Sequence, residues 1–162
     1  MSLTFTDNAG RGWTVAITTD AVKRVRTLLD VDLLEIVEGK LLQRLIQDPV
    51  LLCDVIYVVC KPEADARKVS DEDFGRAMAG DAIEAATKAL LEAIANFFPN
   101  QRDRANLTRV IETTWKAMDR ARDAIDAQLD AGELERIVEQ ALASAGISSG
   151  AAPESSEPTP GP

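Results

Sequence analysis

One stretch, DPVLLCDVIYVVCKP at residues 48–62, constrains the fold of this chain more than any other. Asp48 is a favourable N-cap residue and Pro49 suits the first turn of a helix, whereas Pro62 predicts a stop. A helix that is apolar on nearly every side must be surrounded by other elements. We therefore expect a central buried helix here, although its β-branched residues would also suit a buried strand.

The composition favours a helical domain around that stretch. The chain has 162 residues, of which 46% are hydrophobic but only 4% aromatic. This length fits a single domain with a real core, and the abundance of Ala and Leu favours helices over a β-sandwich. The formal net charge is −9, which repels phosphate backbones. We therefore expect no nucleic-acid partner.

The spacing of apolar residues predicts the order of elements. Alternation at residues 3–6 and 13–17, around the turn-forming DNAGRG, predicts a β-hairpin over residues 3–18 that packs on helices. Residues 63–69 are expected to form a polar connection and residues 146–162, rich in Ser, Gly and Pro, a disordered tail. Helical spacing is expected over residues 21–29 (capped by Thr19 or Asp20), 33–47 with a bend at Gly39, 70–80 with a cap at Ser70 and an end at Gly80, 81–98 with Asp81 as cap, 105–129 and 133–145.

The predicted fold class is therefore mainly α. A small N-terminal β-hairpin is expected to pack on a compact multi-helix domain that spans residues 1–145. An amphipathic helix at residues 133–145 is expected to close this domain, before the tail.

No residue pattern indicates catalysis. The chain has no His, which removes the usual proton shuttle and the commonest metal ligand. Cys53 and Cys60 are roughly 10 Å apart along a helix, too far for a disulfide, so we expect buried apolar side chains, with a reactive thiol as the alternative. Nucleotide-binding, nucleophile-elbow and zinc-ligand spacings are missing. We expect no enzyme activity, cofactor or metal.

Several charged residues and the two Trp residues are candidates for a functional role. Asp54 lies inside the apolar stretch, so we expect it in a polar window or beside a Lys or Arg, with a functional buried acid as the alternative. The cluster of Lys23, Arg24 and Arg26 is expected to be a solvated face, and contact with an acidic partner is its alternative. Trp13 and Trp115 are expected in the core or at its edge, and either could instead anchor an interface.

Two segments carry apolar surface that needs cover from the chain itself or from a partner. Ala-rich residues 81–98 present a wide apolar surface, and the last amphipathic helix presents one apolar stripe that could pack on the core. Both are candidates to receive a partner helix. The candidate partner-binding residues are Leu90, Ile94, Phe97, Phe98, Leu134, Ile137, Val138 and Leu142.

The layout resembles the small tail assembly chaperones of long-tailed bacteriophages and prophages. The resemblance covers roughly residues 3–98 and rests on the GRGW hairpin, the central DPVLLCDVIYVVC and the stretch SDEDFGRAMAGDAIEAATKALLEAIANFF. It implies a mostly helical, non-enzymatic protein that coats the long helical tape-measure protein and is absent from the finished particle. It brings no catalytic residues.

A helical adaptor or regulator that acts through homo-oligomerisation or partner binding stays open as the alternative function. The start of the chain lacks the basic and apolar regions of a signal peptide, and no segment reaches the ~18–20 apolar residues that a bilayer span needs. These features predict a cytoplasmic location without membrane association, in the host cell if the protein belongs to a phage.

Overall fold

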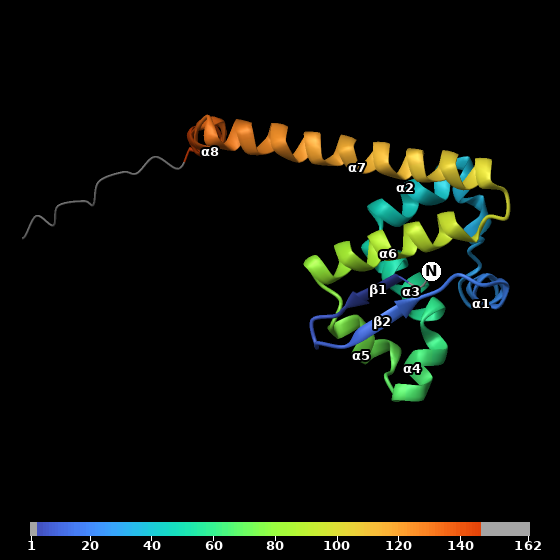
Figure 1. Cartoon of the computed structure of the whole chain (residues 1–162). Coiled ribbons are helices and arrows are strands. Elements are labelled where there is room, and N and C mark those ends of the chain that lie inside the picture. Colours follow the sequence, from blue (N-terminus) through green and yellow to red (C-terminus); the bar gives the residue numbers. More distant parts are fainter. Residues whose placement is uncertain (1–2, 147–162) are drawn as a thin grey trace, which may run out of the picture. The chain divides into compact units, whose positions relative to one another are not determined.

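The computed structural model describes residues 3–146 and is mainly helical, with an N-terminal β-hairpin (Figure 1). The predicted fold class is thereby confirmed. The chain divides into two compact units, Met1–Thr114 and Trp115–Pro162. The predicted tail, apart from Gly146, lies outside the described residues.

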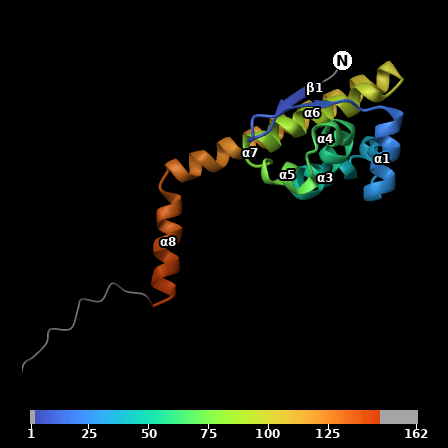
Figure 2. The ribbon, with the colours of Figure 1, turned by 90° about the horizontal axis from the view of Figure 1, so that it is seen from below.

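The hairpin consists of strands β1 (Leu3–Thr6) and β2 (Gly12–Val15), which pair antiparallel with Phe5 opposite Trp13. Phe5 of β1 and the alternating Trp13 and Val15 of β2 are buried. Strand β1 packs along helix α6 (Asp81–Phe97), as Figure 2 shows. The hairpin therefore obtains from α6 the cover that a two-stranded sheet needs in water.

Helix α4 (Lys61–Arg67) closes the outer edge of β2. The Thr14 N–H donates to Glu63 Oε2 at 2.9 Å, and the Thr14 carbonyl accepts from the Cys60 thiol at 3.6 Å. The Gly12 carbonyl accepts from the Arg67 guanidinium at 2.6 Å. These backbone groups point away from β1, so side chains replace a third strand at this edge.

The next elements follow the predicted pattern with one shift. Helix α1 (Thr19–Leu29) is capped by Thr18, whose Oγ1 accepts from the Ala21 N–H. The predicted cap at Thr19 or Asp20 is therefore wrong, because the cap lies one or two residues earlier. The bend predicted at Gly39 is present, because its left-handed φ of 82° separates two short helices. These are the 3₁₀ helix η1 (Leu33–Glu38) and α2 (Lys40–Gln47).

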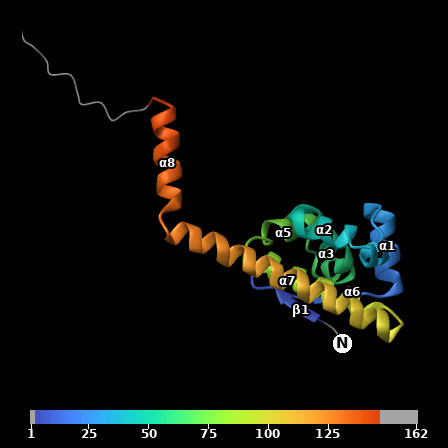
Figure 3. The same cartoon turned by 90° about the horizontal axis from the view of Figure 1, so that it is seen from above.

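Helix α3 (Pro49–Val59) is the central element predicted from the apolar stretch. Asp48 caps it by accepting from the N–H groups of Val50 and Leu51. Helices α1, α2 and α6, together with α5 (Asp71–Arg76), surround it (Figure 3). The helix prediction is confirmed, and the strand alternative is excluded.

The region after α3 departs from the prediction. Pro62 does not end the helical region but lies in the first turn of α4, where its missing N–H costs no hydrogen bond. The segment predicted as a polar connection is therefore largely helical. Ser70 caps α5 as predicted, because its Oγ accepts from the Asp73 N–H, but α5 ends at Arg76 and not at Gly80.

Three helices follow α5 in the part of the chain that the structure describes. Helix α6 begins after Gly80, which has no side chain to cap it, so the predicted cap at Asp81 is not formed. Helix α7 (Gln101–Asp130) begins before the predicted residue 105. Its buried side chains, Leu107 and Ile111, belong to the first unit. The predicted break follows, with Gly132 at φ 72°, and α8 (Glu133–Ser144) comes after it.

Candidate partner-binding surface

The structure places Leu90, Ile94 and Phe97 on α6 and Phe98 at its C-cap, and the first two of these predicted partner-binding residues lie in the core. Leu90 and Ile94 are 0% exposed, because α6 packs on β1 and α3. They have no surface to offer a partner in this conformation. Phe97 and Phe98 at the end of α6 are half-buried, and their ring centroids are 6.4 Å apart.

The other four predicted residues lie on α8 and are exposed. Leu134, Ile137, Val138 and Leu142 are 51%, 58%, 47% and 46% exposed, and no side chain within Glu133–Ser144 is buried. Their spacing places them on one face of the helix. We call these four residues the α8 stripe.

The polar side chains of α8 indicate which partner would fit the stripe. Glu133, Glu135 and Glu139 outnumber the single basic residue, Arg136. An acidic rim favours a partner whose apolar residues are flanked by Lys or Arg. The surface can therefore accept a basic amphipathic helix, through apolar contact at its centre and charge attraction at its edges.

The second half of α7 carries further exposed apolar residues. Ile125 and Leu129 are 55% and 45% exposed, and Trp115 and Met118 are half-buried. Trp13, in contrast, is fully buried and forms a T-shaped pair with Phe74 at a ring-centroid distance of 5.1 Å. Trp13 is a core residue, as expected.

The cysteines behave as structural side chains. Both are free thiols; Cys60 is buried and Cys53 half-buried. Burial raises the pKa of Cys60 to about 12, and burial followed by the charge of Asp54 raises the pKa of Cys53. Since the thiolate is the nucleophile, neither residue is activated for covalent chemistry at neutral pH.

Asp54 occupies a half-exposed position on α3. Burial, followed by the charges of Asp71 and Asp48, raises its pKa. Among the ion pairs of the described residues none involves Asp54, so the polar window predicted for it fits better than a Lys or Arg partner.

The basic cluster on α1 is mostly engaged within the chain. Arg24 donates to Asp20 at 3.0 Å and to the Val58 carbonyl at 2.9 Å. Arg26 pairs with Asp32 at 2.6 Å. Only Lys23 of the three has no such bond among the described residues, so the cluster offers little free positive charge to an acidic partner.

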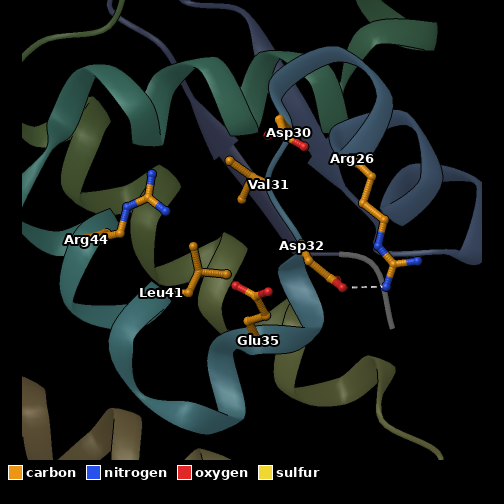
Figure 4. Close-up of a pocket in the computed structure, with 7 residues that line it drawn as sticks. All are labelled: Arg26, Asp30, Val31, Asp32, Glu35, Leu41 and Arg44. Carbon is orange, nitrogen blue, oxygen red and sulfur yellow. Dashed lines mark hydrogen bonds and ion pairs between the residues drawn. The ribbon is translucent and has the colours of Figure 1, made fainter.

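A pocket of about 270 Å³ lies between the end of α1 and α2 (Figure 4). Val31 and Leu41, which line it, are buried. Burial raises the pKa of Asp32, but the hydrogen bonds from Arg26 and the Leu34 N–H outweigh it and lower that pKa overall. The other residues that line the pocket are Arg26, Asp30, Glu35 and Arg44.

Residues 3–146 contain no group of three acidic or cysteine side chains placed to hold a metal.

Sequence reasoning missed Asp7, the main buried charge. Asp7 is 4% exposed and accepts from the N–H groups of Ala9 and Arg11, both at 2.9 Å. Its Oδ2 also accepts from Arg11 Nε at 2.7 Å and from Trp13 Nε1 at 2.9 Å. Four donors thus hold the hairpin turn around one carboxylate. The available signal was an Asp at the start of a turn, followed by an Arg and a Trp that are two residues apart and so lie on the same face of the strand.

Burial on its own raises the pKa of Asp7. The hydrogen bonds from Trp13 and from the backbone and side chain of Arg11 outweigh that effect and lower the pKa overall. Asp7 therefore acts as an ionised structural anchor rather than as an acid or base.

Comparisons with known proteins identify no relative: no family model, curated protein or solved structure matches the chain. In the part that the structure describes, no helix is both long and apolar enough to span a membrane.

Proposed function

We propose that this protein is a tail assembly chaperone of the long-tailed phage type, which binds a tape-measure protein through the α8 stripe. The observation that carries the proposal is the exposure of Leu134, Ile137, Val138 and Leu142 on one helix face. The layout of residues 3–98, described above, is its second support.

The chemistry of the stripe suits a reversible coat. Fully burying a Leu, Ile or Val side chain contributes about 1.5–3 kcal/mol, and these side chains are already partly covered. Association and side-chain ordering oppose that gain. A single stripe therefore supports modest affinity, and many copies along a long helical protein would provide coverage while each copy remains releasable.

The test begins with purification of the full chain from its native host and identification by mass spectrometry of what accompanies it. A very long, helix-rich protein would then be produced with the chain to measure binding directly. Recovery of only copies of the chain, or of a regulatory enzyme, would contradict the proposal and favour the adaptor or regulator.

Substitutions in the α8 stripe test whether this stripe is the binding face. Leu134→Asp, Ile137→Asp and Leu142→Asp should each abolish binding and leave the helical circular dichroism unchanged, because these side chains are exposed. Val37→Asp and Val50→Asp are matched controls, since both residues are exposed valines in the first unit. Normal binding by the α8 variants, or their unfolding, would show that the face is wrongly assigned.

A further inference from the structure

The second half of α7 has the residue spacing of a coiled-coil seam. Trp115, Met118, Arg122, Ile125 and Leu129 follow one another at alternating intervals of three and four residues. This 3.5-residue repeat places them along one side of the helix. We call these five residues the α7 seam.

The C-terminal residues of the seam are exposed. Ile125 and Leu129, the two aliphatic residues nearest the end of α7, are 55% and 45% exposed. Neither is needed for the core of the first unit, which ends at Thr114. An exposed 3.5-residue repeat is the pattern that a second helix covers.

Arg122 determines which helix can cover the α7 seam. Arg122 lies in the middle of the seam and pairs with Asp119 of its own helix at 3.3 Å. Both side chains of that pair are more than half exposed, so the pair is weak and Arg122 can engage another carboxylate. A covering helix must therefore bring an acidic residue to the centre of an otherwise apolar seam.

We propose that a second copy of this chain covers the α7 seam in antiparallel orientation. In a parallel pair Arg122 would face Arg122 of the other copy, which like charges disfavour. In an antiparallel pair Met118 faces Leu129 of the second copy, and Arg122 faces Ile125 with Asp126 beside it. Each copy thus supplies the base, Arg122 in the seam, and the acid, Asp126 beside the seam, as a two-fold symmetric interface requires.

The interface is short and therefore weak. Isolated helices of this length are marginal in water, and two-fold pairing across the seam buries only a few side chains of each copy. We expect a monomer–dimer equilibrium that shifts with protein concentration. This equilibrium is independent of the α8 stripe and is measured on the protein alone.

Sedimentation velocity of the full chain tests the proposal. The weight-average mass should rise toward that of a dimer as concentration increases, and Ile125→Asp should weaken dimerisation at least tenfold. Val110→Asp, at a comparably exposed position of the same helix, and Ile137→Asp on α8 should leave the dimer intact. A wild-type monomer at every concentration would overturn the proposal, as would loss of the dimer in Ile137→Asp but not in Ile125→Asp.

Charge exchange tests the role of Arg122. Arg122→Glu should weaken the dimer, because a carboxylate would then meet Asp126 of the second copy. Adding Asp126→Arg in the same chain should restore much of the affinity. An Arg122→Glu variant that dimerises as well as wild type would rule out this pairing.

Cysteine cross-linking reports the orientation. Met118→Cys and Leu129→Cys chains, when mixed and oxidised, should form a disulfide-linked heterodimer visible on a non-reducing gel. Neither variant alone should cross-link efficiently, and wild type, with its natural cysteines, is the control. Efficient cross-linking of each variant with itself would indicate a parallel pair and overturn the proposal.

Discussion

Helices α6 and α8 carry similar apolar spacing but have opposite environments. In α6, Leu90 and Ile94 are buried by β1 and α3, whereas Ile137 and its neighbours on α8 are exposed. Periodicity defines which face of a helix is apolar, but not what covers that face. The difference arises because α6 finds partners inside its own unit and the α8 stripe does not.

The sharpest way to test this comparison is the same truncation at both helices. Ile94→Ala should lower the free energy of unfolding by about 2–5 kcal/mol, because it leaves a cavity in the core. Ile137→Ala should change it by no more than about 0.5 kcal/mol, because its side chain is exposed. Urea unfolding followed by circular dichroism measures both.

Equal effects of the two truncations would contradict the comparison. A large loss in Ile137→Ala would mean that α8 is covered within the chain, and a small loss in Ile94→Ala would mean that α6 is not part of the cooperative core.

A smaller change in the free energy of unfolding is expected from substitution of Asp7, the buried carboxylate of the first unit. Asp7→Asn should cost about 1–3 kcal/mol at neutral pH, because it removes a charged acceptor from four donors. The folded pKa of Asp7 lies below its unfolded value, so its contribution is present above the unfolded pKa and is lost as pH falls through the folded pKa. The gap between wild type and Asp7→Asn should therefore narrow below about pH 4.

Urea unfolding at a series of pH values measures this gap. Glu139→Gln on α8 provides the matched control, because it removes one carboxylate charge from an exposed side chain. A gap for Asp7→Asn that widens toward acid pH would refute the assigned role.

The smallest changes in stability are expected from substitutions at two residues with positive φ, one in each unit. Lys68 ends α4 at φ 57°, and Gly132 precedes α8 at φ 72°. A Cβ is unfavourable in this left-handed conformation. Lys68→Gly should stabilise the first unit by at most about 1 kcal/mol, since the added chain entropy of glycine offsets part of the gain.

Gly132→Ala should have the opposite sign and a different location. It should increase amide hydrogen exchange at the start of α8 while the urea midpoint of the first unit stays unchanged. Two results would contradict this expectation: a first unit that is destabilised by Lys68→Gly, or a urea midpoint of the first unit that is lowered by Gly132→Ala.

Local signals predicted much of the fold. The caps at Asp48 and Ser70 and the bend at Gly39 were predictable because each depends on a side chain or a φ angle within a few residues. Helix α4 was missed because Pro62 was interpreted as a stop, whereas proline is equally compatible with a first turn.

Long-range burial was less predictable. Asp7 resembles an ordinary turn residue, and only the packing of Trp13 under the hairpin turns it into a buried charge. Leu90 and Ile94 were predicted as binding residues because a wide apolar face looks the same whether its cover comes from the same chain or from another. Those distinctions depend on tertiary contacts that spacing does not encode.

The closed edge of β2 affects how copies of this protein can meet. An open strand edge is a template on which identical chains can stack without limit. Here Cys60, Glu63 and Arg67 occupy the hydrogen-bonding positions of that edge. Two copies of the chain are thereby kept from joining through this edge into a continuous sheet, even where their local concentration is high.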